Sequence, residues 1–395
     1  MPICLKKCRV NSEATIAFIR QNADADVRQL ALRGTKDPEV DLPFALDQIA
    51  GRQTARHKLP SWAAIDGIVY PPHLSMEQCS SEQTARYKAS LIGSGGTMVD
   101  LTGGFGVDFS FLALGFQRAV YVERQEQLCA IARENFRLLG LSQAEVVCGD
   151  STDYLQTMSP VDFIYADPAR RDNHGARTYG ISDCTPDVLA LRDQLLSKAR
   201  RVLLKLSPML DWRKAVSDLG EQYVREVHIV SVGNECKELL LLLGRGSGQR
   251  LLCVNDDQVF EPTAQIAQAP QAAHSPHYLY EPNASVMKAG CFTELSQHYG
   301  VAPIAHDSHL FVSADHVGGF PGRSFQIDAM TTMNKRDLKE TLQGLTQANI
   351  TVRNFPLSVA ELRRRLKLSE GGSTYIFATT LATGDRRLFV CHKVV

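Results

Sequence analysis

Four acidic residues, each at the end of a short apolar run, stand out in the middle of the chain. They are Asp100, Glu123, Asp150 and Asp167. If the runs are parallel strands, these acids meet at the carboxyl edge of one sheet, where open α/β sheets bind ligands. Glu123 could then accept hydrogen bonds from ribose hydroxyls, and Asp150 could reach an adenine amino group. Any one acid could be a helix cap, but the set of four favours a nucleotide-like ligand.

A glycine-rich turn follows Asp100 in the run VDLTGGFGVD. Its candidate ligand-binding residues are Thr102, Gly103, Gly104 and Gly106. Glycines between a strand and a helix let the backbone approach a ligand closely. The spacing G-G-x-G differs from the G-x-G-x-x-G of dinucleotide folds, and Asp108 at the start of the next helix disfavours a pyrophosphate. S-adenosylmethionine, which carries a sulfonium and an ammonium but no phosphate, fits better than a nicotinamide dinucleotide.

Short β-branched runs alternate with amphipathic helices between residues 98 and 244, which predicts an α/β fold with a parallel sheet covered on both faces. The predicted strands are 97–100, 119–123, 144–150, 162–167, 201–207, 223–232 and 238–244, and the clearest helices are 124–139, 187–200 and 211–219. We expect Thr185-Pro186 to begin one helix and Asp211 to cap another. Only Gly-Asn-Glu-Cys-Lys separates the last two strands, so they should pair antiparallel.

The rest of the chain divides around this region. Residues 1–75 predict helices interrupted by proline and glycine, and 245–282 look like a connector with one short strand. A helix is expected at 284–299, and from 324 the order strand, helix, strand, helix, strand, strand predicts a small α+β unit, with a capping box at Ser358–Glu361. The expected domains are 1–75, 76–245, 246–325 and 326–395.

Composition limits the function classes. The 395 residues carry no net charge, but 331–395 carry +6 while 91–330 carry −8, so a polyanion would bind the C-terminal part. The ten cysteines are scattered without a CxxC pair, which indicates reduced thiols in the cytoplasm and no zinc site. No apolar run is long enough to span a membrane, and no secretory signal is visible.

The motifs DLTGGFG (100–106), Glu123, GDSTDYL (149–155) and DPAR (167–170) resemble those of class I S-adenosylmethionine-dependent methyltransferases. This resemblance covers residues 76–244 and implies a Rossmann-like, seven-stranded methyltransferase sheet. The antiparallel final pair agrees with the seventh strand of that fold.

A narrower resemblance covers nearly the whole chain. The runs EQCSSEQTARYKA (77–89), KLSPMLDW (205–212), NECKELL (234–240) and YLYEPNASVMKAG (278–290) are similar to those of bacterial methyltransferases with a C-terminal THUMP-like domain. That family implies a small ferredoxin-like segment before the THUMP-like unit and a likeness to RNA-modifying enzymes. It also implies that the helix carrying Thr84 and Lys88 lies over the methionine end of the cofactor. A cap (Thr84) and a surface lysine (Lys88) are the plain alternatives.

The stretch DFIYADPARRD (162–172) holds the candidate catalytic residues Asp167, Pro168 and Arg170. Amino-group methyltransferases of nucleic acids carry Asp/Asn-Pro-Pro-Tyr/Phe here, where the acid or amide accepts the amino hydrogens and the aromatic ring stacks on the base. This chain lacks the second proline and the aromatic residue. Arg170 could stack or bind phosphate, and His174 or Tyr179 could supply the platform. Arg170 and Arg171 could instead only pair with Asp167 or Asp172.

The sequence Asp-Pro-x-Arg also resembles that of uridine C5 methyltransferases, which need a cysteine two residues before a proline. Leu206 occupies that position before Pro208, which argues against covalent catalysis by a thiolate. Lys205 could orient a substrate or only extend from a strand end.

These patterns predict an S-adenosylmethionine-dependent methyltransferase acting on a base of tRNA or rRNA, with Asp167 orienting the acceptor. The alternatives are methylation of a protein or small molecule, an RNA-binding protein with a vestigial cofactor pocket, and a nicotinamide-binding enzyme. We expect no metal, no membrane and no obligate protein partner.

Overall fold

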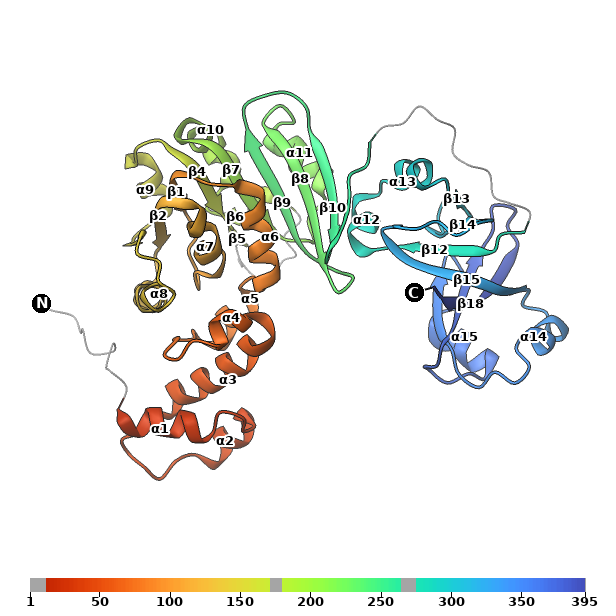
Figure 1. Cartoon of the computed structure of the whole chain (residues 1–395), viewed down its shortest axis with the longest axis horizontal. Coiled ribbons are helices and arrows are strands. Elements are labelled where there is room, and N and C mark those ends of the chain that lie inside the picture. Colours follow the sequence, from red (N-terminus) through yellow and green to blue (C-terminus); the bar gives the residue numbers. More distant parts are fainter. Residues whose placement is uncertain (1–11, 171–179, 264–274, 395) are drawn as a thin grey trace, which may run out of the picture. The chain divides into compact units, whose positions relative to one another are not determined.

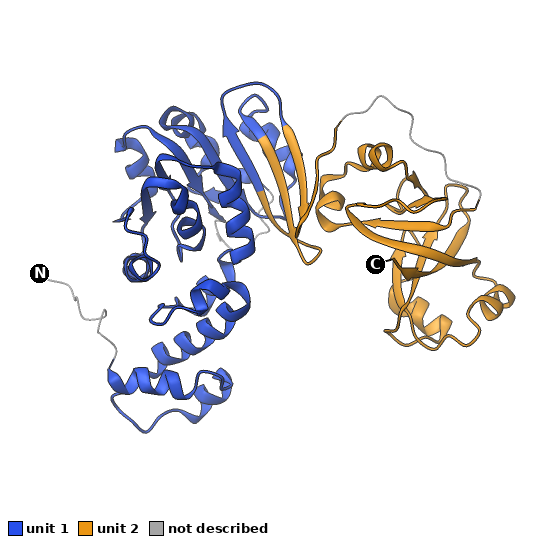
Figure 2. Ribbon diagram, in the orientation of Figure 1, with its two compact units in different colours: residues 1–225, 240–249 blue, residues 226–239, 250–395 orange. Residues whose placement is uncertain are grey.

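The structure is a computed structural model that describes residues 12–170, 180–263 and 275–394. The chain forms two compact units. Unit 1 comprises Met1–Arg225 and Leu240–Gln249, and unit 2 comprises Glu226–Leu239 and Arg250–Val395 (Figure 2).

Unit 1 begins with helices, as predicted. They are α1 (Glu13–Gln21), α2 (Val27–Arg33), α3 (Leu42–Lys58), α4 (Pro60–Ala63), α5 (His73–Gln78) and α6 (Glu82–Ile92). Side-chain oxygens of Ser12, Asp26, Asp41 and Ser81 cap four of them. Trp62 and Tyr70 pack against Phe105 of the glycine-rich turn, so the helical region and the following sheet share one apolar cluster.

The predicted strand–helix alternation is confirmed. The strands are β1 (Gly95–Asp100), β2 (Phe116–Glu123), β3 (Ala144–Cys148), β4 (Val161–Ala166), β7 (Ala199–Leu206), β8 (Val224–Val232) and β9 (Glu235–Gly244). The helices between them are α7 (Val107–Leu112), α8 (Glu126–Leu138), α9 (Ser151–Thr157), α10 (Val188–Lys198) and α11 (Trp212–Leu219). Figure 1 shows α7 and α8 on one side of the sheet and α9 and α10 on the other.

Strand order places β1 between β2 and β4, with both pairings parallel. The full order is β11-β10-β8-β9-β7-β4-β1-β2-β3. Gly233 and Asn234, both with positive φ, form the two-residue turn between β8 and β9. Two such residues are typical of a type I′ hairpin turn, so the last predicted pair is antiparallel, as expected.

Three expectations need correction. The sheet has two strands beyond the predicted seven, because the region 245–282, where one short strand was expected, contributes β10 (Arg250–Asn255), parallel to β8, and β11 (Gln258–Phe260). Thr185-Pro186 does not begin a helix: α10 starts at Val188 under an Asp187 cap, and Thr185 lies in β6 (Cys184–Thr185), paired with β5 (Ala169–Arg170). The helix expected at 284–299 is two helices separated by Gly290, which has a left-handed conformation.

Unit 2 contains a second, seven-stranded sheet in the order β13-β14-β12-β15-β18-β17-β16. The strands are β12 (Tyr278–Pro282), β13 (Ala302–Pro303), β14 (Phe311–Ser313), β15 (Gly322–Thr331), β16 (Asn349–Arg353), β17 (Thr374–Thr380) and β18 (Arg386–Lys393). The helices are α12 (Ala284–Ala289), α13 (Phe292–Tyr299), α14 (Lys335–Thr341) and α15 (Val359–Leu366), and the predicted capping box at Ser358 is present. Alternate side chains of β17 enter two apolar clusters, one containing Phe377 and the other Ile376 and Ala378.

Candidate functional site

The carboxyl edge of the large sheet gathers the predicted acids. Asp100 and Glu123 end β1 and β2, Asp167 follows β4, and Asp150 follows β3. Because β1 to β4 are parallel, these ends lie at one edge.

The glycine-rich turn is tightly fitted against β2 and α8. A Cβ atom on Gly103 would lie 2.3 Å from the Tyr121 ring, and one on Gly106, whose φ is +85°, would lie 2.8 Å from Phe136. The Tyr121 hydroxyl donates a hydrogen bond to the Gly104 carbonyl. These positions therefore require glycine for packing against the protein itself, and the turn brings bare backbone to the edge where the acids lie.

Glu123 connects the end of β2 to this turn. Its Oε2 accepts a hydrogen bond from the Gly104 amide at 2.9 Å, and its Oε1 accepts one from Gln125 at 2.8 Å. Each carboxylate oxygen can accept a further bond, so a diol remains within its capacity. Asp150 caps α9 by accepting from the amides of Thr152 and Asp153, which is the helix-cap role weighed for each of these acids.

Asp100, Thr102 and Asp167 form one chain of hydrogen bonds. Asp100 Oδ1 accepts from the Thr102 amide at 2.8 Å, and the Thr102 hydroxyl accepts from the Asp167 amide at 2.6 Å. Asp100 is almost completely buried. Burial, reinforced by the carboxylates of Asp108 and Asp167, raises the pKa of Asp100 to about 8.

Asp108, at the start of α7, is surrounded by hydrogen-bond donors and cations. Its Oδ2 accepts bonds from the hydroxyls of Tyr165 (2.7 Å) and Ser80 (2.8 Å), and its Oδ1 lies 3.1 Å from Lys88 Nζ. Burial opposes ionisation, but Lys88 and then Lys205 hold the pKa of Asp108 below its usual range. Asp108 is therefore already neutralised by lysines, and its predicted influence on the charge of a ligand is correspondingly weak.

Lys205 connects Asp108 to the candidate catalytic acid. Its Nζ lies 2.5 Å from Asp167 Oδ2 and 4.0 Å from Asp108 Oδ2. Among the described side chains, the ion pair of Asp167 is thus with Lys205. Pro168 is buried, and the backbone of Arg170 pairs with Cys184 in the short β5–β6 ladder. The expectations for Arg171, Asp172, His174 and Tyr179 lie outside the described residues.

The two expectations on α6 have different outcomes. The Thr84 hydroxyl donates to the Ser81 carbonyl at 3.2 Å within the first turn of its own helix, so its described contacts are local. Lys88 is not a surface lysine: its side chain has 0% exposure. The sequence signal for this burial was weak, although Lys88 follows Thr84 by one helical turn and shares its buried face.

Sequence reasoning missed the buried charge cluster and the role of Tyr121. The sequence signal for Tyr121 was the presence of a tyrosine within an apolar strand that follows the glycine-rich turn. The pairing of Asp108 with Lys205 had no such signal, because the two residues lie on separate elements far apart in the chain.

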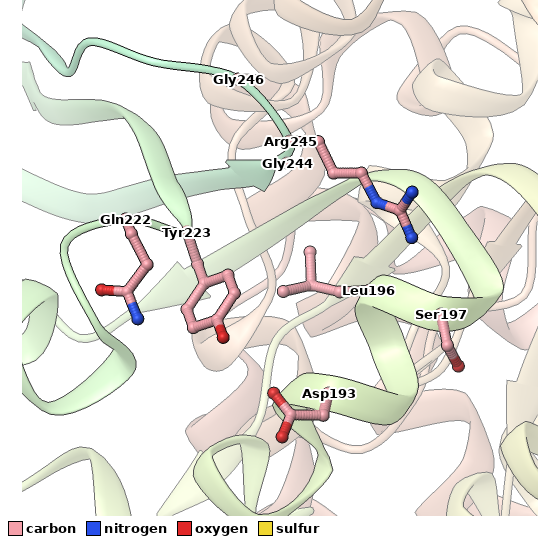
Figure 3. A pocket seen from close by; sticks show the side chains of 8 residues that line it. All are labelled: Asp193, Leu196, Ser197, Gln222, Tyr223, Gly244, Arg245 and Gly246. Atoms are coloured by element: carbon pink, nitrogen blue, oxygen red, sulfur yellow. The ribbon is translucent and has the colours of Figure 1, made fainter.

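A cavity of about 370 Å³ lies away from these acids, near the end of α10 and the start of β8 (Figure 3). It is lined by Asp193, Leu196, Ser197, Gln222, Tyr223, Gly244, Arg245 and Gly246. Ala199 begins β7 and Val224 begins β8, so this cavity is at the amino ends of these strands. Nothing in its lining connects it to the acids at the carboxyl edge.

The described residues contain no cluster of three or more His, Cys, Asp or Glu side chains able to hold a metal ion. Within that same part of the chain, no helix combines the length and apolar character needed to cross a bilayer.

Comparisons with known proteins extend this picture. A family model for a THUMP domain-like region matches residues 322–393, and one for a ferredoxin-like domain matches 278–321. Among curated proteins, none matches significantly. Two solved structures overlap only about two-fifths of this chain. An rRNA methylase from Streptococcus thermophilus is 16% identical over 42% of this chain and 95% of its own (TM-score 0.31). TrmK from M. capricolum, bound to S-adenosyl-homocysteine, is 10% identical over 42% and 69% (TM-score 0.33).

A further solved structure matches over nearly the full length of both chains. It is a crystal structure of a "putative methyltransferase" from Porphyromonas gingivalis W83, 32% identical to this chain, covering 98% of this chain and 99% of its own, with a TM-score of 0.85. With the motifs at the carboxyl edge and the matched C-terminal domains, this shows that the chain belongs to the bacterial family of class I S-adenosylmethionine-dependent methyltransferases with a C-terminal THUMP-like domain.

Proposed function

We propose that this protein transfers a methyl group from S-adenosylmethionine to a base of a structured RNA, tRNA or rRNA. The observation that carries the proposal is the position of Asp167. It stands just after strand β4, joined through Thr102 to the glycine-rich turn and paired with Lys205. A candidate acceptor-binding group and a candidate cofactor-binding turn are therefore adjacent.

The residues at this edge suit the cofactor. Gly103, Gly104 and Gly106 would lie along it, Glu123 would accept from its ribose hydroxyls, and Asp100 would offer a buried carboxyl group that a cationic ligand would ionise. When bound, S-adenosylmethionine supplies a methyl group on a sulfonium that is already a strong electrophile. The protein then has to align the acceptor and exclude water, and no strong base is needed for that.

Asp167 would align the acceptor by accepting a hydrogen bond from the base. Because Lys205 balances its charge, the Asp167–Lys205 pair suits an uncharged nucleobase better than the ammonium of a protein lysine, which Lys205 would repel. The described Asp167–Lys205 pair thus favours RNA over a cationic protein side chain as acceptor.

The THUMP-like match supports RNA as the substrate. Exposed cations follow one another along α15 and just beyond it, namely Arg364, Arg365 and Lys367. Cations of this kind bind phosphates with little sequence preference, which suits a domain that holds a folded RNA while another domain modifies it.

The test is transfer of tritiated methyl from S-adenosylmethionine to fractionated RNA and protein from cells that lack the gene. We expect label in one RNA size class with the wild type and none with Asp167→Ala, which should still bind the cofactor in calorimetry. Asp153→Ala, which removes an exposed carboxylate from α9, is the matched control and should keep full activity. Label only in protein, or cofactor binding without transfer to any fraction, would refute the proposal.

A further inference from the structure

Asp108 is the centre of a buried charge network that joins three elements of unit 1. Lys88 comes from α6, Lys205 from the end of β7, and Asp108 from the first turn of α7. Lys88 Nζ lies 3.1 Å from Asp108 Oδ1, and Lys205 Nζ lies 4.0 Å from Asp108 Oδ2. Lys205 then reaches Asp167 Oδ2 at 2.5 Å. The network therefore ends on the candidate acceptor-binding carboxylate.

Ordinary packing does not require such a network. A fully buried ammonium carries a large desolvation penalty, and replacing buried ion pairs by apolar side chains is often neutral or stabilising. Tyr165 and Ser80 donate hydrogen bonds to Asp108 Oδ2, so the carboxylate that faces Lys205 at 4.0 Å is itself held in place. A rigid carboxylate behind Lys205 gives that flexible side chain a defined position beside Asp167.

We propose that Lys205 is a positioning residue for methyl transfer: anchored by Asp108, its ammonium keeps Asp167 ionised and holds one of its two oxygens. This inference rests on the proposed function and deepens it. Asp167 then works only as a hydrogen-bond acceptor for the base, because a cation in contact with it opposes proton uptake. Asp108 and Lys88 act on the reaction only through Lys205.

A purely structural network makes different predictions. If Lys205 only braces the end of β7, its loss lowers stability and leaves the pH dependence of catalysis unchanged. If it positions Asp167, its loss lowers kcat, changes the KM for RNA less, and moves the acidic limb of the kcat profile to higher pH. The second pattern follows because the substitution removes a cation in contact with Asp167, which makes proton uptake by that carboxylate easier.

The first experiment compares Lys205→Met, which removes the charge at similar length, with Lys205→Arg, which keeps it. We expect kcat for RNA to fall about 100-fold in Lys205→Met, with cofactor affinity changed only a few-fold, and to recover at least in part in Lys205→Arg. An acidic limb identical to the wild type in Lys205→Met, or no loss of kcat, would overturn the proposal.

The second experiment tests the anchoring by Asp108. The paired substitution Lys88→Met/Asp108→Asn removes both charges of the buried pair together, so neither is left uncompensated. We expect it to lower kcat by itself but to cause no further loss in a Lys205→Met background, since the effect passes through Lys205. If the loss of kcat caused by Lys88→Met/Asp108→Asn is equally large with and without Lys205→Met, Asp108 acts by another route, and its assigned role is overturned.

A third measurement needs no RNA and separates this inference from the proposed function. The carboxyl carbons of 13C-labelled aspartates are followed by NMR against pH, and Asp167 is identified by comparison with Asp167→Asn. We expect Asp167 to titrate at higher pH in Lys205→Met than in the wild type. An unchanged titration would overturn the inference even if RNA is methylated. A shifted titration would support it even if no RNA acceptor is found.

Discussion

Glu281 on β12 accepts a hydrogen bond from Arg353 on β16 at 3.0 Å, although β15, β18 and β17 lie between these strands in the order of the sheet. Neighbouring strands are about 4.8 Å apart, so a flat sheet would separate β12 from β16 by about 19 Å. Two side chains cannot bridge that distance, and the second sheet must therefore curl. Arg323, directly opposite Glu281 in the β12–β15 register, donates to the same carboxylate.

We predict that Glu281→Ala unfolds part of unit 2. Glu281 is buried, and its removal leaves Arg323 and Arg353 without their shared counter-ion. Breaking a fully buried ion pair from one side costs about 3–5 kcal/mol, and we expect a smaller loss here because the side chains of Arg323 and Arg353 are 40% and 34% exposed to water. Amide hydrogen exchange of β12 and β16 measures this local unfolding. Tryptophan fluorescence does not report on it, because both tryptophans, Trp62 and Trp212, belong to unit 1.

The matched control for Glu281 is Glu370→Ala. Glu370 is an exposed partner of Arg363 in the same unit, and pairs of that kind contribute about 0–1 kcal/mol. Equal losses of amide-exchange protection in Glu281→Ala and Glu370→Ala would show that the Glu281–Arg353 contact stabilises unit 2 no more than an exposed ion pair does.

We predict that Gly103→Ala impairs cofactor binding. The new Cβ would lie 2.3 Å from the Tyr121 ring, a distance that forces the turn or the ring to move. Tyr121 donates to the carbonyl of Gly104, so its displacement disturbs the backbone proposed to lie along the cofactor. Calorimetry should show at least about a tenfold weaker binding of S-adenosylmethionine, equal to about 1.4 kcal/mol.

Gly149→Ala serves as the control for Gly103, because its Cβ would meet no atom within 4 Å. Gly149 lies at the same sheet edge, just after β3. We expect Gly149→Ala to bind S-adenosylmethionine with unchanged affinity. Weak binding in both variants would indicate a general loss of folding at the edge of the sheet.

The order of elements in the large sheet and in the helices that cover it could be predicted from sequence because the signals are local. Apolar runs alternate with amphipathic helices, acids such as Asp211 cap their own helices, and the Gly233-Asn234 turn directs β9 back along β8. The candidate cofactor edge was predictable for the same reason, since parallel strands bring their carboxyl ends together.

Other features depend on contacts between distant segments, which a single sequence does not reveal. The β10 strand joins the large sheet by parallel pairing with β8, where Cys253 aligns with Ile229, and no local pattern specifies that partner. The burial of Lys88 likewise depends on Asp108, contributed by the helix after β1. The prediction that Thr185-Pro186 begins a helix was wrong because Asp187, two residues after Thr185, is the better cap.

We predict that cofactor binding releases a proton from Asp100 near neutral pH. Burial raises the pKa of Asp100 to about 8, above the value of about 3.9 expected in an unfolded chain. The folded protein therefore binds more protons between these values, and the contribution of Asp100 to stability falls as pH rises through this window. A cationic ligand favours the ionised carboxylate, so affinity should rise from pH 6 to pH 8.

Calorimetry in two buffers of different ionisation enthalpy measures the released proton. Asp100→Asn keeps an oxygen for the Thr102 amide but has no proton to release, so its affinity should be weaker and independent of pH over this range. Wild-type binding without proton release at pH 7 would contradict the prediction.

We predict that Arg364→Gln/Arg365→Gln weakens RNA binding without affecting cofactor binding. Both arginines are exposed on α15, and among the residues that the structure describes neither forms an ion pair with an acid. Each phosphate contact contributes about 0.9 to the slope of log K against log salt, so loss of two should reduce the slope by about 2. Fluorescence anisotropy with a labelled RNA stem-loop at several salt concentrations measures this change.

The control variant Arg118→Gln/Arg137→Gln removes two arginines of unit 1 that are paired with Glu145 and Glu134, and it should leave the slope unchanged. Equal slopes in all three proteins would exclude α15 as the surface that binds RNA phosphates.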